Sequence, residues 1–178
     1  MLSETVDWQT SPNWLPLNSY LDAILTTLAS LPLRFAARKI LLSSFSPDVC
    51  IALVRKRVPY PVYFLNDGRA PTPDPRASSL QSALRFASAW GLDGIVLEST
   101  PLIACPRLVH LVKAKGLKLA TYGASNNESG SVRSQREHGI DGIIVDRVKD
   151  IFMDCENCEV NVTSRRDADC RGGRQSNK

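Results

Sequence analysis

The sequence predicts an α/β fold in which parallel strands alternate with helices. Short apolar runs recur along the chain, without the alternation of polar and apolar residues that a half-exposed strand shows. Consecutive apolar residues are typical of strands that helices cover. The runs begin roughly 20 to 33 residues apart, close to the ~30 residues of a strand–helix–strand unit. Such alternation implies a parallel sheet.

Five segments are predicted to be strands: Ile40–Phe45, Pro61–Leu65, Gly94–Glu98, Leu117–Tyr122 and Gly142–Asp146. Five strands do not close an eight-stranded barrel. The periodicity alone therefore leaves two architectures open, a partial barrel and a small open sheet of the flavodoxin type.

The segments around these strands carry residues typical of helix boundaries. Ser46 is predicted to cap a helix that begins at Pro47, because proline at the first helical position loses no hydrogen bond. Glycine is favoured just beyond the end of a helix, and glycines follow three other segments. The other predicted helices are Leu21–Leu31, Ser79–Trp90, Ser131–His138 and one that begins at Pro106 and ends before Gly116.

The α/β pattern covers residues 20–150 of the 178 residues, a length that favours one domain. Residues 1–19 show no clear periodicity and are predicted to be an irregular N-terminal segment. Residues 151–178 are predicted to be a disordered tail, because most of this segment is too polar to offset the entropy of ordering it.

Charge and hydropathy argue against several partners. The net charge of +4 comes from scattered Lys and Arg, whereas nucleic-acid binding needs clustered cations. No apolar run approaches the ~20 residues of a membrane span. The apolar stretch from Leu21 to Ala37 lacks a basic leader and lies far from Met1, so it does not resemble a signal peptide. We expect a cytoplasmic protein.

The five cysteines do not predict a metal site. Cys155 and Cys158 form a C-x-x-C pair with Cys170 further on, but both histidines lie in predicted helices elsewhere. A structural zinc site normally needs four ligands at matched spacings. Cys50 and Cys105 are expected to be buried on apolar helix faces. We assign no metal ligand, and the role of the tail cysteines stays open.

The carboxyl ends of parallel strands gather functional residues. Asp67 and Glu98 could form a carboxylate pair for a divalent cation, although Asp67-Gly68 is favoured as a turn. The loop with Asn126 and Asn127 could present amides to a phosphate, or it could be only a turn. The candidate side chains are Ser43, Ser44, Phe45, Asn66, Asp67, Glu98, Ser99, Tyr122, Asn126, Asn127, Asp146 and Arg147.

Five segments in order resemble one family, the glycerophosphodiester phosphodiesterases, and most closely their fungal, glycerophosphocholine-cleaving type. These segments are Arg38–Cys50, Tyr60–Leu65, Leu92–Val96, Thr121–Gly123 with Asn126 and Asn127, and Gly139–Asp146.

The resemblance implies that residues 20–150 are the C-terminal part of a (β/α)₈ TIM barrel, roughly its last five βα units. It implies hydrolysis of a glycerophosphodiester to glycerol 3-phosphate and an alcohol such as choline, with Mg²⁺ or Ca²⁺. The family's catalytic histidines and metal carboxylates belong to motifs that this sequence does not contain. We therefore assign no catalytic residue, and we expect a fragment that binds no metal and is inactive by itself.

The resemblance also implies a substrate site. Tyr122 is the first candidate to contact the glycerol or the head group, and Ser44, Glu98 and Asn127 are expected to line the same site. The alternative is a non-catalytic remnant that binds a phosphate ester or a protein in phosphate sensing. Exposed sheet edges are expected to favour association with another chain.

Overall fold

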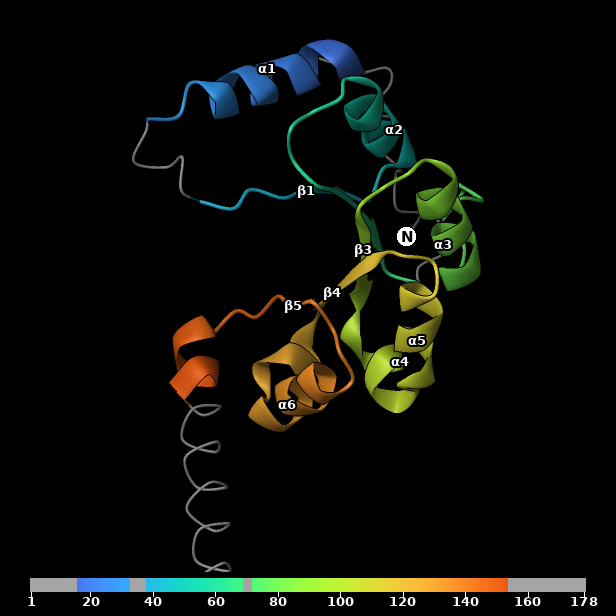
Figure 1. Cartoon of the computed structure of the whole chain (residues 1–178), viewed down its shortest axis with the longest axis vertical. Helices are drawn as coiled ribbons and strands as arrows, with labels where there is room; N and C mark the ends of the chain where they lie inside the picture. Colours follow the sequence, from blue (N-terminus) through green and yellow to red (C-terminus); the bar gives the residue numbers. More distant parts are fainter. Residues whose placement is uncertain (1–15, 33–37, 69–71, 154–178) are drawn as a thin grey trace, which may run out of the picture.

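The structure is a computed structural model and describes residues 16–32, 38–68 and 72–153. Its strands form one parallel sheet in the order β1-β2-β3-β4-β5 (Figure 1). This confirms the predicted α/β fold. Each strand lies beside its neighbours in sequence, which is the order of a barrel wall and not the reordered sheet of a flavodoxin type. The strands are β1 (Leu42–Ser44), β2 (Val62–Asn66), β3 (Gly94–Glu98), β4 (Lys118–Tyr122) and β5 (Gly142–Ile143).

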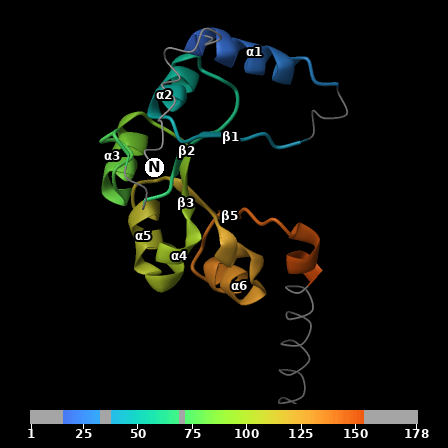
Figure 2. The ribbon, with the colours of Figure 1, turned by 180° about the vertical axis from the view of Figure 1, so that it is seen from behind.

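Helices connect consecutive strands, and α1 precedes the first one. Figures 1 and 2 show α1 near α2 at one end of the molecule and α6 at the other end, near β5. Residues 148–153 are also helical. The other helices are α1 (Leu17–Ala29), α2 (Pro47–Arg55), α3 (Leu80–Ala89), α4 (Ser99–Ala104), α5 (Arg107–Lys113), the 3₁₀ turn η2 (Ala124–Asn127) and α6 (Ser129–Glu137).

The two faces of the sheet are packed differently. On the outer face, strand residues such as Phe64 and Ile95 join side chains of α2, α3 and α5 in the main core. On the inner face, Tyr63, Val96 and Ala120 form a smaller cluster, and all its described members come from strands. Successive strand residues point to opposite faces. The inner face is therefore the side that faces the axis of a barrel.

Two predicted strands are shorter in the structure. β1 begins at Leu42 rather than Ile40, and β5 ends at Ile143 rather than Asp146. After β5, Val145 packs with Val132 and Ile151. The sequence also does not predict α4, which Glu98 caps through the Thr100 amide.

The ends of the α/β region extend beyond the predicted boundaries. α1 begins at Leu17, so the last residues of the predicted irregular segment are helical. The helix over residues 148–153 buries Ile151, so the predicted tail is ordered at its start. Residues 1–15 and 154–178, with Cys155, Cys158 and Cys170, lie outside the described residues.

The two described cysteines differ in their exposure to solvent. Cys50 is fully buried on α2, as predicted, and burial raises the pKa of its thiol to about 12. The prediction for Cys105 is wrong: this residue is exposed, because it follows the end of α4 in the link to α5. Within the described ranges, every helix is too short or too polar to cross a membrane.

A repeated Asp-Gly-Ile motif begins β3 and β5. Asp93 Oδ2 accepts a hydrogen bond from the Val62 amide at 2.8 Å. Asp141 Oδ2 accepts one from the Leu119 amide at 2.7 Å. Each carboxylate thus binds the amino end of the preceding strand. The same motif therefore aligns β3 with β2 and β5 with β4.

The glycines of the two motifs have different surroundings. A Cβ atom at Gly94 would lie 2.6 Å from the Lys118 carbonyl oxygen and 2.7 Å from the Tyr63 ring. A Cβ atom at Gly142 would lie 3.4 Å from the Ala120 Cβ, an ordinary contact. Only the glycine of β3 is therefore required for the close approach of the Tyr63 ring.

We predict that Gly94→Ala lowers the free energy of unfolding by about 3 kcal/mol, since the new methyl group overpacks the sheet. Gly142→Ala, the matched control, is expected to change it by less than about 1 kcal/mol. Urea denaturation of both variants checks this. Equal losses in the two variants would contradict the close contact at Gly94.

Asp141 is held by three partners. Burial acts to raise its pKa, but the Leu119 amide, Lys113 and Lys118 donate hydrogen bonds that outweigh this effect and hold the pKa below its ordinary value. Lys113 reaches Asp141 from the last turn of α5, so the ion pair joins the helix to β4 and β5.

A lowered folded-state pKa contributes stability that is present above the unfolded pKa of about 3.9 and is lost as the pH falls through the folded value. We therefore predict that Asp141→Asn lowers the free energy of unfolding by about 1 kcal/mol at pH 7. The difference from wild type should shrink at pH 3. Urea denaturation at both pH values tests this, with exposed Asp150→Asn as control. A loss that is the same at both pH values would contradict it.

Candidate functional site

Glu98 and Tyr122 lie side by side at the carboxyl edge of the sheet. They are direct partners in the register between β3 and β4. Tyr122 packs with Leu65 on the inner cluster. Glu98 follows Val96 of that cluster by two positions and so points to the same face. The structure thus brings together two of the four predicted site residues.

Phe45, which follows β1, completes this group. Its ring centroid lies 6.2 Å from that of Tyr122, with an interplanar angle of 85°. β1 and β4 are three strand positions apart, which in a flat sheet would separate them by about 14 Å. The rings meet because the sheet curves toward its inner face. Phe45 is 56% exposed, so much of its ring is open to a ligand.

The Glu98 carboxylate is fixed in position. Its Oε2 accepts a hydrogen bond from the Thr100 amide at 3.1 Å, and its Oε1 accepts one from the Thr100 hydroxyl at 2.7 Å. A Cβ atom at Gly123 would lie 3.0 Å from Oε1, and Gly123 has φ +120°. Glycine at this position therefore lets the carboxylate lie against the end of β4.

Ser44 points away from Glu98 and Tyr122. It follows Leu42, which packs on the outer core, by two positions. Its hydroxyl accepts a hydrogen bond from the Ser46 amide at 3.1 Å, at the start of α2. The geometry indicates a role in the β1–α2 turn, and substrate binding by Ser44 stays a prediction.

Asn127 is bound to Asp146, in the segment after β5. Its Nδ2 donates to Asp146 Oδ2 at 2.8 Å, and its Oδ1 accepts from the Asp146 amide at 2.9 Å. These reciprocal bonds hold η2 against the end of the sheet. Substrate binding by Asn127 likewise stays a prediction.

The neighbouring Asn126 is fully buried in a polar network. Its Nδ2 donates to the Thr121 hydroxyl at 3.2 Å and to the Ile144 carbonyl at 2.9 Å. Its Oδ1 accepts from Gln135 Nε2 at 2.8 Å. Both asparagines thus connect the loop to β4, β5 and α6, which favours the turn interpretation of this loop over phosphate binding.

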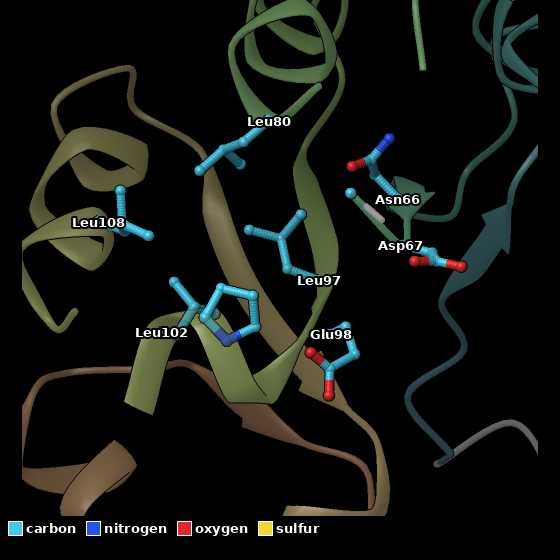
Figure 3. A pocket seen from close by; sticks show the side chains of 9 residues that line it. Asn66, Asp67, Leu80, Leu97, Glu98, Leu102 and Leu108 are labelled. Carbon is cyan, nitrogen blue, oxygen red and sulfur yellow. The ribbon is translucent and has the colours of Figure 1, made fainter. Parts of the chain in front are cut away.

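A small cavity lies behind the same edge. Figure 3 shows Asn66 and Asp67 at the end of β2, Glu98 at the end of β3, and leucines of β3 and the helices around the space. The cavity of about 40 Å³ can hold water but not a phosphodiester. Asn66 Oδ1 is buried there without a hydrogen-bond partner among the described residues, which suits a bound water. Gly68 has φ +68°, as the predicted turn requires.

The described residues do not form a site with enough ligands for a divalent cation. Asp67 and Glu98 reach the same edge, but within the described ranges no three His, Cys, Asp or Glu side chains are grouped as metal ligands. Both Glu98 oxygens accept hydrogen bonds from Thr100. His110 is exposed on α5, and exposed His138 ends α6. Because α6 runs back from the carboxyl edge to the start of β5, its last residue lies near the opposite edge.

The comparisons identify related proteins. The Glycerophosphoryl diester phosphodiesterase family model matches residues 10–150. A glycerophosphocholine phosphodiesterase of Schizosaccharomyces pombe is 44% identical over 149 residues, which are 83% of this chain and 13% of that protein. A chloroplastic glycerophosphodiester phosphodiesterase of Arabidopsis thaliana is 39% identical over 133 residues, 74% of this chain and 36% of that protein. This chain thus spans a minor part of either relative.

A solved structure shows the same fold. The glycerophosphodiester phosphodiesterase of Parabacteroides distasonis superimposes with a TM-score of 0.57 at 15% identity, over 82% of this chain and 55% of that one. Its likeness supports the fold of a partial barrel. The chain belongs to the glycerophosphoryl diester phosphodiesterase family, whose members generally depend on divalent metal ions.

Proposed function

We propose that the carboxyl edge of this sheet forms one wall of a glycerophosphodiester-binding site. The enzyme to which this wall belongs would hydrolyse the diester to glycerol 3-phosphate and an alcohol. One observation carries the proposal: Glu98 and Tyr122 are register partners on the inner face, at the edge where barrel enzymes bind substrates. The family membership supports this choice of ligand.

The charge of Glu98 orients the ligand. A phosphate placed beside this carboxylate would be repelled, by about 4 kcal/mol for unit charges 4 Å apart near a protein surface. The hydroxyl or cationic end of a diester is compatible with the same carboxylate. The Tyr122 ring, packed on the inner cluster, offers an apolar surface for the carbon atoms beside it.

We propose that this chain binds the ester but does not cleave it by itself. Acid–base catalysis needs a proton-transfer group within hydrogen-bond reach of the ester, and neither described histidine lies at the carboxyl edge. The catalytic groups and any Mg²⁺ or Ca²⁺ ligands would then come from further strands of the barrel. The proposed setting is the cytoplasm.

We also propose that the open inner face associates with the strands that complete the barrel. Leu41, Phe45 and Ile144 are each at least 44% exposed beside the edge strands β1 and β5. Exposed apolar groups and unpaired sheet edges favour association.

Titration of the purified chain with glycerophosphocholine, followed by amide NMR shifts, tests the proposed function. Saturable shifts are expected at the ends of β3 and β4, and Tyr122→Ala should weaken binding about tenfold because it removes an aromatic contact. Tyr20→Ala, which changes an exposed ring on α1, is the matched control. We expect no hydrolysis with Mg²⁺ or Ca²⁺.

A folded chain that shows no shifts at this edge would contradict the binding proposal. Hydrolysis that a chelator abolishes would contradict the claim that the chain does not cleave the ester by itself.

A further inference from the structure

Thr100 donates one hydrogen bond to each oxygen of the Glu98 carboxylate. Its amide binds Oε2 at 3.1 Å, and its hydroxyl binds Oε1 at 2.7 Å. The amide bond is sufficient to cap α4, because a cap requires only that a side-chain oxygen accepts from a backbone N–H of the first turn. The hydroxyl bond involves no backbone group of the helix. Helix capping therefore leaves the shorter of the two bonds unexplained.

The two bonds together fix the plane of the carboxylate. The last torsion of a glutamate side chain is broad, so a single hydrogen bond still lets the carboxylate group rotate. Donors on both oxygens remove that rotation. The Thr100 hydroxyl is itself well placed for this, because a β-branched side chain has few χ1 rotamers in a helix.

We propose that Thr100 is a positioning residue: its hydroxyl holds Glu98 in the orientation in which the carboxylate meets a bound ester. This inference rests on the proposed function and adds to it a residue that acts through Glu98. A side chain that is already held in place loses less conformational entropy when a ligand binds. Hydrogen bonds from surrounding residues are the usual means of holding the side chains of a binding site.

Gly123 supplies the space that this orientation requires. A Cβ atom at Gly123 would lie 3.0 Å from Glu98 Oε1, the same oxygen that the Thr100 hydroxyl binds. A larger residue at this position would therefore press on Oε1. The orientation of Glu98 thus depends on a donor at residue 100 and on open space at residue 123.

The Thr100 hydroxyl also lies 3.4 Å from Ser125 Oγ in η2. A carboxylate only accepts hydrogen bonds, so the Thr100 proton points to Glu98 and Ser125 is the donor in the hydroxyl pair. The distance is long for two hydroxyls, so this contact is weaker than the one to Glu98. Loss of the Ser125 hydroxyl is therefore expected to disturb Glu98 less than loss of the Thr100 hydroxyl.

Titration of the whole chain with glycerophosphocholine, followed by NMR, tests the effect on binding. Thr100→Val removes the hydroxyl but keeps the branched shape and the amide, and it should weaken binding about fivefold, the factor that one hydrogen bond contributes. Thr100→Ser restores the hydroxyl and should restore the affinity. Ser125→Ala should weaken binding less than about twofold. Thr27→Val, which removes a hydroxyl bound to the Ala23 carbonyl on α1, is the matched control.

Relaxation of a ¹³C-labelled Glu98 side chain in the ligand-free protein separates positioning from helix capping. The order parameter of this side chain is expected to fall in Thr100→Val and to recover in Thr100→Ser. The thermal unfolding midpoint should stay close to that of the wild type in both variants, because the amide bond that caps α4 remains. A residue that served only the cap would leave the order of Glu98 unchanged.

An unchanged order parameter of Glu98 in Thr100→Val would overturn the inference. A less ordered Glu98 with unchanged affinity for glycerophosphocholine would overturn it as well, and the proposed function would stand. If the wild-type chain binds no glycerophosphocholine, the proposed function fails, and the order parameters alone decide whether Thr100 holds the carboxylate.

Discussion

The parallel pairing of β3 with β4 positions the candidate site. It begins at Gly94 and Lys118, where only a glycine fits between the strand and the Tyr63 ring, and it ends with Glu98 beside Tyr122. A one-residue slip in this register would move the Tyr122 side chain to the outer face. The close contact at one end of the strands thus determines which side chains meet at the other end.

The curvature of the sheet brings the Phe45 ring to Tyr122, which the register between β3 and β4 alone does not do. Phe45 follows β1 and Tyr122 ends β4, two strands that do not pair, yet their rings are in contact because the sheet bends as a barrel wall does. Hydrogen bonds of the loop then hold this edge in place: Asn126 and Asn127 connect η2 to the segment that follows β5. The site is therefore an apolar corner with one carboxylate, held by a polar network behind it.

The fold could be predicted from sequence because consecutive apolar runs identify parallel strands. The same runs conceal which face each residue occupies, since the strand residues that point to either face are apolar. This is why Ser44 was an expected site residue, whereas its neighbour Phe45 is the one that meets Tyr122. The partner of Asn127 was also not predictable, because Asp146 lies in the segment after β5 and no local pattern joins the two residues. Family resemblance supplied Tyr122 and Glu98, and the structure shows that they are neighbours.

A nuclear Overhauser spectrum of the aromatic protons tests the central claim, that the curved sheet brings strand ends together into one corner. The account predicts cross-peaks between the Phe45 and Tyr122 rings, since edge-on rings 6.2 Å apart bring protons into range. Phe64 and Phe86, whose centroids are 4.9 Å apart in the core, provide an internal control. Core cross-peaks without any between Phe45 and Tyr122, with both rings assigned, would contradict the corner.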